Sequence, residues 1–259
     1  MLTMEQYNRK FLCNVGCDYL KTIVIIQARM GSSRLPGKVL KELGDVDVLT
    51  YDIERCRAIK GVSEVVVATS HLPQDDAIAK WCEIHKVSYF RGSEDDVLDR
   101  YVQCSKIYKP DYVMRVTSDC PFLDYEMASE IVSLMEKEQK DIVLLNGELS
   151  RGLAVELVSY DALLRIYERG TESRHREHVT YYAYEFPKEF NAVTYNVPSN
   201  RLAPELRLTL DTVEDYKLVS TVAKHFNNTL VSSLEVIRYL KATPQVARLN
   251  AHIKQKPVI

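Results

Sequence analysis

The sequence predicts an α/β protein built on a mostly parallel, twisted sheet that is flanked by helices. Short β-branched runs alternate with helical hydrophobic patterns through the first half of the chain, and each run ends in a polar loop. The second half carries the same two patterns in a less regular order. Strand–helix alternation requires a parallel sheet with helices on both faces, and ligands of such sheets bind beyond the carboxyl ends of the strands. The site is therefore expected where the polar loops converge.

The first half contains the most regular part of the pattern. The expected strands are Ile23–Ile26, Val65–Ala68, Val87–Phe90 and Tyr112–Val116. The expected helices, in which hydrophobic positions recur at helical spacing, are Val48–Ile59, Asp75–His85, Asp95–Ile107 and Tyr125–Met135. The strands lead into the loops QARMGSSR, TSHLPQDD, RGSEDD and TSDCP. Because parallel strands end at one edge of a sheet, these four loops are expected to meet.

The second half is expected to add shorter elements. The run Ala154–Val158 leads into a helix near Asp161–Glu168, and Ala192–Asn196 and Leu206–Leu210 have the pattern of strands. Further helices are expected in RHREHVTYYAYE, Val213–His225 and Ser233–Lys241. No internal repeat, low-complexity tract or linker divides the chain, so one compact domain with an inserted lobe is the expected organisation.

Composition narrows the class of protein. Hydrophobic residues make up 46% of the 259 residues and charged residues 27%, as in ordinary globular proteins. The net charge of −2 argues against a nucleic-acid partner. No apolar run is long enough to span a bilayer, and the N-terminus lacks the apolar core of a signal peptide. We therefore expect a cytoplasmic protein without a membrane partner, whose six cysteines are free thiols rather than zinc ligands.

The stretch QARMGSSRLPGKVL follows the first expected strand and resembles a phosphate-binding P-loop without matching it. Gly31 lies one residue too far from the Gly-Lys pair, Pro36 removes a backbone N–H, and Val39 stands where the metal-binding hydroxyl belongs. A different anion-binding loop remains possible, because the stretch carries closely spaced cations.

Those cations are Arg29, Arg34 and Lys38, interleaved with glycine and serine. Such groups bind a triphosphate through charge-assisted hydrogen bonds, and arginine is suited to bidentate contacts. The alternative is a solvated surface loop, since Arg and Lys usually lie outside. Three cations within ten residues favour binding.

Two aspartates are candidates for a metal site. Asp119 follows the strand Tyr112–Val116, and Asp211 follows the run Leu206–Leu210. Mg²⁺ prefers one or two carboxylates together with phosphate oxygens. Each aspartate has an ordinary alternative role, because Asp is common in turns and at helix N-caps. Asp215, one turn further on, is expected to be a solvated or dipole-favoured charge.

Three weaker signals remain. Gly92 and Ser93 form a flexible turn that allows close approach to a nucleotide base or ribose. Asp45-Val46-Asp47 resembles the D-x-D metal motif of sugar transferases, although a short acidic turn between two elements is the favoured explanation. Among the histidines, His178 in REHVT is the one to follow, although a lone helical histidine is usually structural.

Taken together, these stretches resemble the CMP-sugar synthetases, that is the acylneuraminate and 3-deoxy-manno-octulosonate cytidylyltransferases, and most of all the spore-coat-polysaccharide type. The resemblance runs from about Ile23 to His225 and rests on QARMGSSRLPGKVL, VVVATS, FRGSEDDVLDRY, RVTSDCPFLD and LRLTLDTVEDY, with REHVTYYAYE as a sixth stretch. It implies a Rossmann-like nucleotidyltransferase fold of the GT-A-like kind, with a small inserted dimerisation lobe. The implied parts are a cytidylyltransferase domain (22–230) with the lobe at about 149–199, an N-terminal extension (1–21) and C-terminal helices (231–259).

The resemblance also implies roles for residues. The catalytic groups would be Arg29, Lys38, Asp119 and Asp211, of which the two aspartates bind Mg²⁺. The triphosphate and the rest of the CTP molecule would be lined by Ala28, Arg29, Ser33, Arg34, Lys38, Ser70, Gly92 and Ser93. The sugar acceptor or the interface of a homodimer would be faced by Glu156, Arg176 and His178.

The implied reaction transfers CMP from CTP to the hydroxyl of a nonulosonic or other acidic sugar, releasing pyrophosphate, for surface polysaccharide biosynthesis. The chain departs from the spore-coat type at Ala154, where relatives tend to carry an acidic residue, and at Gly44–Asp47, where they carry a different turn. These departures leave CTP binding in place and bear on the identity of the acceptor. Three alternatives to the implied reaction are open. They are an acceptor such as a polyol phosphate, a catalytically silent nucleotide-binding subunit, and a sugar-transferring enzyme that uses the D-x-D stretch.

Overall fold

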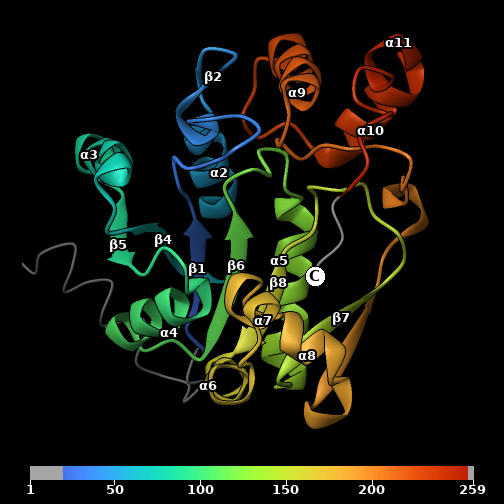
Figure 1. Cartoon of the computed structure of the whole chain (residues 1–259). Helices are drawn as coiled ribbons and strands as arrows, with labels where there is room; N and C mark the ends of the chain where they lie inside the picture. Colours follow the sequence, from blue (N-terminus) through green and yellow to red (C-terminus); the bar gives the residue numbers. More distant parts are fainter. Residues whose placement is uncertain (1–19, 256–259) are drawn as a thin grey trace, which may run out of the picture.

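The computed structural model describes residues 20–255 and is organised around one seven-stranded sheet with the strand order β5-β4-β1-β6-β8-β7-β9. Its strands are β1 (Thr22–Gln27), β4 (Val62–Ser70), β5 (Ser88–Gly92), β6 (Tyr112–Thr117), β7 (Ile142–Asn146), β8 (Glu156–Ser159) and β9 (Ala192–Asn196). The first four run parallel, whereas β8 is antiparallel to both of its neighbours. The predicted mostly parallel α/β sheet is confirmed. β1 and β6 point toward the end of the molecule that carries β2, α9 and α10 (Figure 1).

Helices cover both faces of this sheet. On one face α2 (Val48–Arg57), α3 (Asp76–His85) and α5 (Tyr125–Glu138) share a hydrophobic cluster with Val24 and Ile26 of β1. On the other face α4 (Val97–Tyr108), α6 (Tyr160–Arg169) and α8 (Tyr181–Glu185) share a second cluster with Ile23 and Ile25. The alternation follows from the strand geometry, in which successive side chains point to opposite faces. β1 is thus buried on both faces, as a central parallel strand should be.

A third hydrophobic cluster closes the end of the molecule above the strand ends. It joins the hairpin β2 (Glu42–Leu43) and β3 (Val46–Asp47) to α9 (Val213–Phe226), α10 (Ser233–Ala242) and the short α11 (Pro244–Ala247). The predicted final helices are therefore present. No helix within residues 20–255 is long and apolar enough to cross a membrane.

The predicted strand Leu206–Leu210 is wrong. The segment is buried, but it joins the sheet at no point and forms one isolated bridge, from Arg207 to Arg151. Its N–H groups bond to loops instead, with Leu208 donating to Arg151 and Leu210 donating to Asp119. It lies so close to the turn at Gly152 that a Cβ there would be 2.7 Å from the Leu208 backbone. The segment therefore crosses the strand ends and brings Asp211 to them.

Two further predictions need correction. The strand β7 has no counterpart among the predicted strands. The single helix expected in RHREHVTYYAYE is broken into α7 (Ser173–Glu177) and α8, because Val179 between them has a positive φ of 29°.

The region 149–199 supplies β8 and β9 to the main sheet, so part of the predicted lobe belongs to that sheet. Its dimerisation role stays a prediction, and most of the predicted extension (1–21) lies outside the described residues.

Candidate active site

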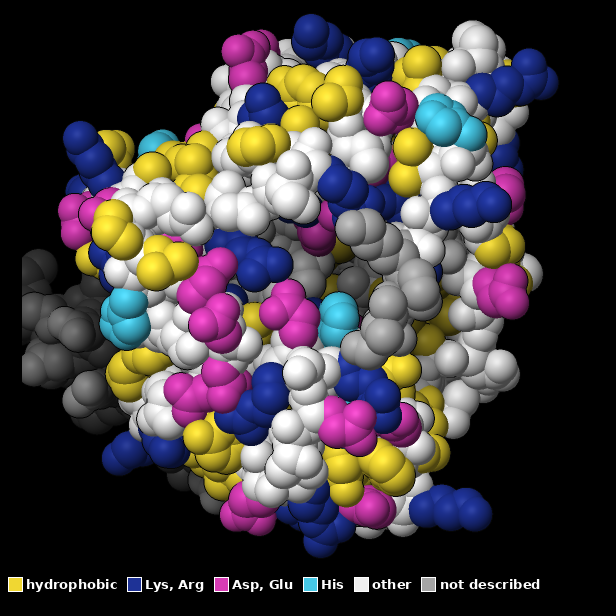
Figure 2. All heavy atoms as spheres, in the orientation of Figure 1, with side chains coloured by type: hydrophobic (Ala, Val, Ile, Leu, Met, Phe, Trp, Pro, Cys, Tyr) yellow, Lys and Arg dark blue, Asp and Glu magenta, His cyan; other side chains and the backbone are white. Residues whose placement is uncertain are grey.

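Most of the predicted site residues line one cavity of about 610 Å³ at the carboxyl ends of β1 and β6. They are Ala28, Arg29, Ser33, Arg34, Lys38, Asp119, Glu156, His178 and Asp211. Basic and acidic side chains gather around a hollow on this face (Figure 2). A larger groove of about 770 Å³ runs along α5, but none of the strand-end loops reaches it. The cavity at the strand ends is therefore the candidate site.

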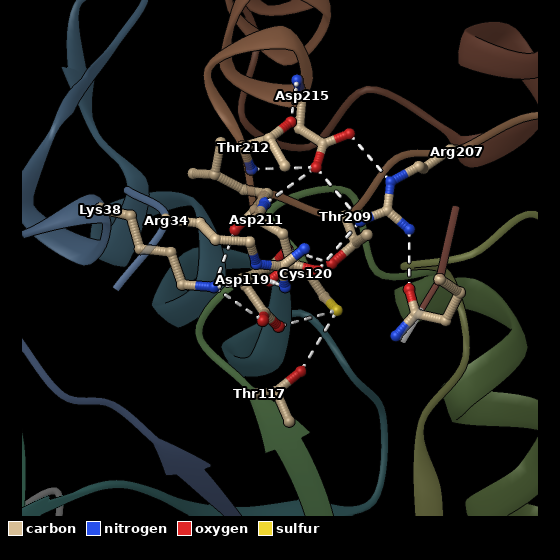
Figure 3. Close-up of polar contacts among 12 residues, drawn as sticks. Arg34, Lys38, Thr117, Asp119, Cys120, Arg207, Thr209, Asp211, Thr212 and Asp215 are labelled. Atoms are coloured by element: carbon tan, nitrogen blue, oxygen red, sulfur yellow. Dashed lines mark hydrogen bonds and ion pairs between the residues drawn. The ribbon is translucent and has the colours of Figure 1, made fainter. Parts of the chain in front are cut away.

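Lys38 reaches the two aspartates from the side of the loop after β1 (Figure 3). Its Nζ donates to Asp119 Oδ2 at 2.9 Å, to Asp211 Oδ1 at 3.0 Å and to the Leu210 carbonyl at 2.8 Å. Burial lowers the pKa of Lys38, but the two carboxylates raise it by more, so that its pKa lies above the ordinary value. The side chain is therefore an ammonium held between two carboxylates.

Hydrogen bonds join the two segments that carry these carboxylates. The Asp119 carbonyl accepts from Leu210 N at 2.7 Å and from Thr209 Oγ1 at 3.1 Å, which fixes the loop after β6 against the crossing segment. Neither aspartate is an N-cap, because Asp124 caps α5 and Thr212 caps α9. The capping alternative is thus wrong for both, and their side chains are free to act in the cavity.

Burial and charge act in opposite directions on Asp119. Burial raises the pKa of its carboxyl, but Lys38 and hydrogen bonds from Lys38 and Thr117 lower the pKa to about 2. Asp211 carries two more ion pairs, to Arg34 at 3.3 Å and to Arg207 at 3.0 Å. Both carboxylates are charged groups whose negative charge is compensated by cations.

Asp215 is not the solvated charge that its sequence position suggested. It is fully buried and binds Arg207 through both carboxylate oxygens, at 2.9 and 3.1 Å. It also completes the capping box of α9 with Thr212. Asp215 therefore positions the Arg207 guanidinium beside Asp211.

The other end of the cavity is built on neighbouring strands. Arg115 on β6 faces Glu156 on β8 across the antiparallel ladder, and its Nη1 lies 2.9 and 3.0 Å from the two carboxylate oxygens. Arg115 Nε also donates to Gln27 at the end of β1, at 3.1 Å, and Thr180 donates to Glu156. Burial and the charge of Arg115 lower the pKa of nearby His178, which is therefore neutral at pH 7.

Four predicted residues do not line the cavity. Ser70 is buried and donates its hydroxyl to Asp75, while Gly92 packs so tightly that an added Cβ would be 2.9 Å from Arg100. Ser93 accepts from the Asp96 N–H at the start of α4. Arg176 binds Asp96 and lies over the Tyr167 ring, 4.5 Å from its centroid. Their contacts are structural, and any nucleotide or acceptor role for them stays a prediction.

Sequence reasoning missed several cavity residues, which are Gln27, Arg100, Arg115, Arg151 and Glu177. Arg115 had a usable signal, because a charged residue inside the β-branched run YVMRVT has to be paired or to face a site. Arg100 is buried at the start of α4 and donates to the Ser93 carbonyl at 2.8 Å.

The residues present fit a magnesium ion. Asp119 and Asp211 converge on one point that already binds a cation, the Lys38 ammonium. Within residues 20–255 no group of three or more His, Cys, Asp or Glu side chains forms a closed metal site. Two carboxylates completed by phosphate oxygens and water is the arrangement that Mg²⁺ prefers.

The D-x-D stretch does not reach this point. Asp47 caps α2 and binds both Thr50 and the Trp81 indole, at 2.8 and 2.6 Å. Asp45 lies exposed in the turn between β2 and β3. The acidic-turn interpretation therefore accounts for both carboxylates.

Comparison with known proteins identifies the family of this chain. The model of the cytidylyltransferase family matches residues 23–256. The chain belongs to that family. It is 35% identical to the spore coat polysaccharide biosynthesis protein SpsF of Bacillus subtilis, over 87% of this chain and 96% of that protein. The resemblance to the spore-coat type is thereby confirmed.

Two other relatives of this cytidylyltransferase are similar along nearly their whole length. An uncharacterized protein of Methanocaldococcus jannaschii is 38% identical over 92% of this chain and 97% of its own length. The structure of a cytidylyltransferase from Leptospira borgpetersenii superposes with a TM-score of 0.83 at 30% identity, over 92% of this chain and 100% of that one. Family and fold agree with the geometry of the cavity, and CTP-dependent nucleotidyl transfer follows from them.

Proposed function

We propose that this enzyme transfers CMP from CTP to the hydroxyl of a nonulosonic or other acidic sugar, with Mg²⁺ and with release of pyrophosphate, for surface polysaccharide biosynthesis. One observation carries the proposal, namely that a loop of cations faces two strand-end carboxylates in a single cavity. The Bacillus subtilis relative is a spore coat polysaccharide biosynthesis protein by name, which supports the polysaccharide role. A homodimer in the cytoplasm belongs to the same proposal.

The loop provides the triphosphate subsite. Arg29, Arg34 and Lys38 are the charges that bind the β- and γ-phosphates and compensate the charge that develops on the leaving pyrophosphate. Asp119 and Asp211 would hold Mg²⁺, which when bound would compensate the α-phosphate charge and lower the pKa of the attacking hydroxyl. The acceptor hydroxyl loses its proton to water and its oxygen attacks the α-phosphorus in line, as the bond to the pyrophosphate oxygen breaks. The protein's task is therefore positioning and charge compensation.

The strand-built end of the cavity provides the acceptor subsite. Glu156 and Gln27 offer oxygens to sugar hydroxyls, and the neutral His178 imidazole can donate or accept a hydrogen bond. Arg115 fixes the orientation of Glu156 through hydrogen bonds to both of its carboxylate oxygens. Ala154 lies exposed at this wall, where it leaves space that a carboxylate side chain would fill.

Two alternatives share the fold and the nucleotide site. One is cytidylyl transfer to a non-sugar-acid acceptor such as a polyol phosphate. The other is a subunit that binds CTP without turning it over. The paired carboxylates of Asp119 and Asp211 weigh against the second, because a silent subunit has no need of a metal site.

Calorimetric titration with CTP, UTP, ATP and GTP, each with and without Mg²⁺, tests the nucleotide. We expect CTP to bind best, and to bind better with Mg²⁺. Pyrophosphate release with 3-deoxy-manno-octulosonate, N-acetylneuraminate and a polyol phosphate then separates the alternatives. Preference for another nucleotide would refute the proposal, and release with the polyol phosphate alone would replace the acceptor. CTP binding without release from any acceptor would favour the silent subunit.

A further inference from the structure

The two sets of groups that the proposed function assigns to different ligands bind each other. Lys38 and Arg34, assigned to the triphosphate, form ion pairs with Asp119 and Asp211, assigned to the metal, at 2.9 to 3.3 Å. The cations come from the loop after β1, whereas the carboxylates lie at the end of β6 and before α9. The loop is therefore held across the cavity by the groups that would receive substrate.

Every N–H donor of the Lys38 ammonium has an acceptor. An ammonium has three N–H donors, and its three acceptors here are Asp119 Oδ2, Asp211 Oδ1 and the Leu210 carbonyl. The other two carboxylate oxygens also have donors, since Arg207 binds Asp211 Oδ2 and the Cys120 thiol binds Asp119 Oδ1. A metal ion placed between the two carboxylates therefore meets this ammonium. Two cations repel at such separations, the more strongly where water is excluded, and the Lys38 side chain is only 12% exposed. The ammonium has to leave before a metal can enter.

We propose that the metal enters this site as its chelate with CTP, because Lys38 and Arg34 hold the carboxylates until a triphosphate draws both cations away. The proposal rests on the proposed function for the identity of the nucleotide. A metal ion alone would displace the two cations without offering them an anion. CTP alone would draw the cations to its phosphates and leave two neighbouring carboxylates unpaired. The chelate supplies an anion for the loop and a cation for the carboxylates in one step.

Binding of metal and nucleotide is thereby coupled, and such coupling is reciprocal. Arg207 is not part of the exchange, since Asp215 and Gln255 hold it, the latter at 2.8 Å. It remains beside Asp211 throughout and lowers the attraction of that carboxylate for a free metal ion. Lys38 and Arg34 are therefore the charges whose removal should uncouple the two ligands.

Binding of Mn²⁺ alone, measured by electron paramagnetic resonance without nucleotide, tests this directly. Lys38→Gln should bind Mn²⁺ on the order of tenfold more tightly than the wild type, a typical coupling magnitude. Arg34→Gln should tighten binding by a smaller factor, because the Arg34 side chain is 34% exposed and, of the two aspartates, pairs with Asp211 alone. Lys41→Gln is the matched control, because Lys41 lies over the Tyr216 ring and contacts neither carboxylate. It should leave the Mn²⁺ affinity within twofold of wild type.

Two further measurements secure the interpretation. Adding Asp119→Asn to Lys38→Gln should abolish the gain in Mn²⁺ affinity. That result would assign the bound Mn²⁺ to the pair Asp119 and Asp211. CTP should raise the Mn²⁺ affinity of the wild type by a larger factor than that of Lys38→Gln. The proposal is overturned if Lys38→Gln and Arg34→Gln bind Mn²⁺ alone no more tightly than wild type. That result does not depend on turnover, so it is distinct from failure to find CTP or acceptor activity.

Discussion

The two walls of the cavity are built in different ways. The loop wall consists of residues 28–38 together with Asp119 and Asp211, and its ion pairs join segments that are not hydrogen-bonded neighbours in the sheet. The strand wall consists of Gln27, Arg115 and Glu156, which lie on adjacent strands and are held in register by the β1–β6–β8 ladders. The charged side chains of the loop wall are held by ion pairs with one another, whereas those of the strand wall are placed by backbone pairing of their strands.

This difference in construction suits the charges of the loop wall and those of the strand wall to different tasks. Cations on a loop can exchange one anion for another at little structural cost, because few backbone hydrogen bonds have to break. Arg115 and Glu156 lie opposite each other on paired strands, so the backbone keeps them adjacent as a constant surface for the proposed acceptor. Substitutions in the loop wall should therefore change binding and turnover, and those in the strand wall should also change stability.

The largest expected effect is on turnover in the loop wall. Asp119→Asn should lower kcat by roughly 10²–10³, the usual cost of one transition-state charge contact. The fold should remain, because Lys38 keeps Asp211 and the Leu210 carbonyl as partners. Steady-state pyrophosphate release and thermal unfolding check both parts. Asp45→Asn removes an exposed carboxylate of the β2–β3 turn and serves as the control, with kcat expected within twofold. Turnover above a tenth of wild type for Asp119→Asn would contradict its assigned role.

The next effect is on stability in the strand wall. Glu156→Gln leaves the Arg115 guanidinium, which is only 11% exposed, without its counter-charge. Removing one partner of a buried pair costs about 3 kcal/mol in the free energy of unfolding, and less where one partner is partly exposed as Glu156 is. Urea unfolding measures this loss.

Glu177→Gln provides the comparison within the same cavity. Its pair with Arg29, at 3.4 Å between side chains that are 38% and 43% exposed, should contribute about 0–1 kcal/mol. Equal losses of stability for the two glutamate variants would remove the distinction between the walls.

The regular half of the fold could be predicted from sequence because each element had its own period. The runs around Ile23–Ile26 and Tyr112–Val116 are β-branched and end in polar loops, which located the cavity as well as the strands. Leu206–Leu210 has the same local pattern but pairs with loops. Whether an extended segment finds a strand or a loop beside it depends on the rest of the chain, and its own residues do not report this.

The site shows the same limit. Arg29, Arg34, Lys38, Asp119 and Asp211 were predictable as a charged set at strand ends, whereas their mutual pairing was not. Ser93 sits in a turn whose sequence suits either a ligand or a helix start, and the structure uses it for the start of α4. Arg115 was missed because a strand position was taken as core. Strand pairing, which places it opposite Glu156, is a long-range property.

The last expected effect concerns acid stability and distinguishes the ion pairs of the loop wall from general packing. The pKa of Asp119 falls from an ordinary 3.8 to about 2, so its stabilising contribution is complete above about pH 4 and is lost as the pH falls through about 2. One pKa unit corresponds to about 1.4 kcal/mol, which limits the contribution to about 2 kcal/mol.

In Lys38→Gln the carboxyl keeps its burial but loses the adjacent ammonium, so its pKa should rise and that contribution should disappear. The advantage of the wild type over Lys38→Gln in the free energy of unfolding should therefore shrink between about pH 4 and pH 2, as urea unfolding across this range can measure. A constant difference over that range would mean that Lys38 stabilises the protein by packing alone. The ion pairs of Lys38 with the two carboxylates would then contribute nothing to stability, and the charge-based contrast between the two walls would be lost.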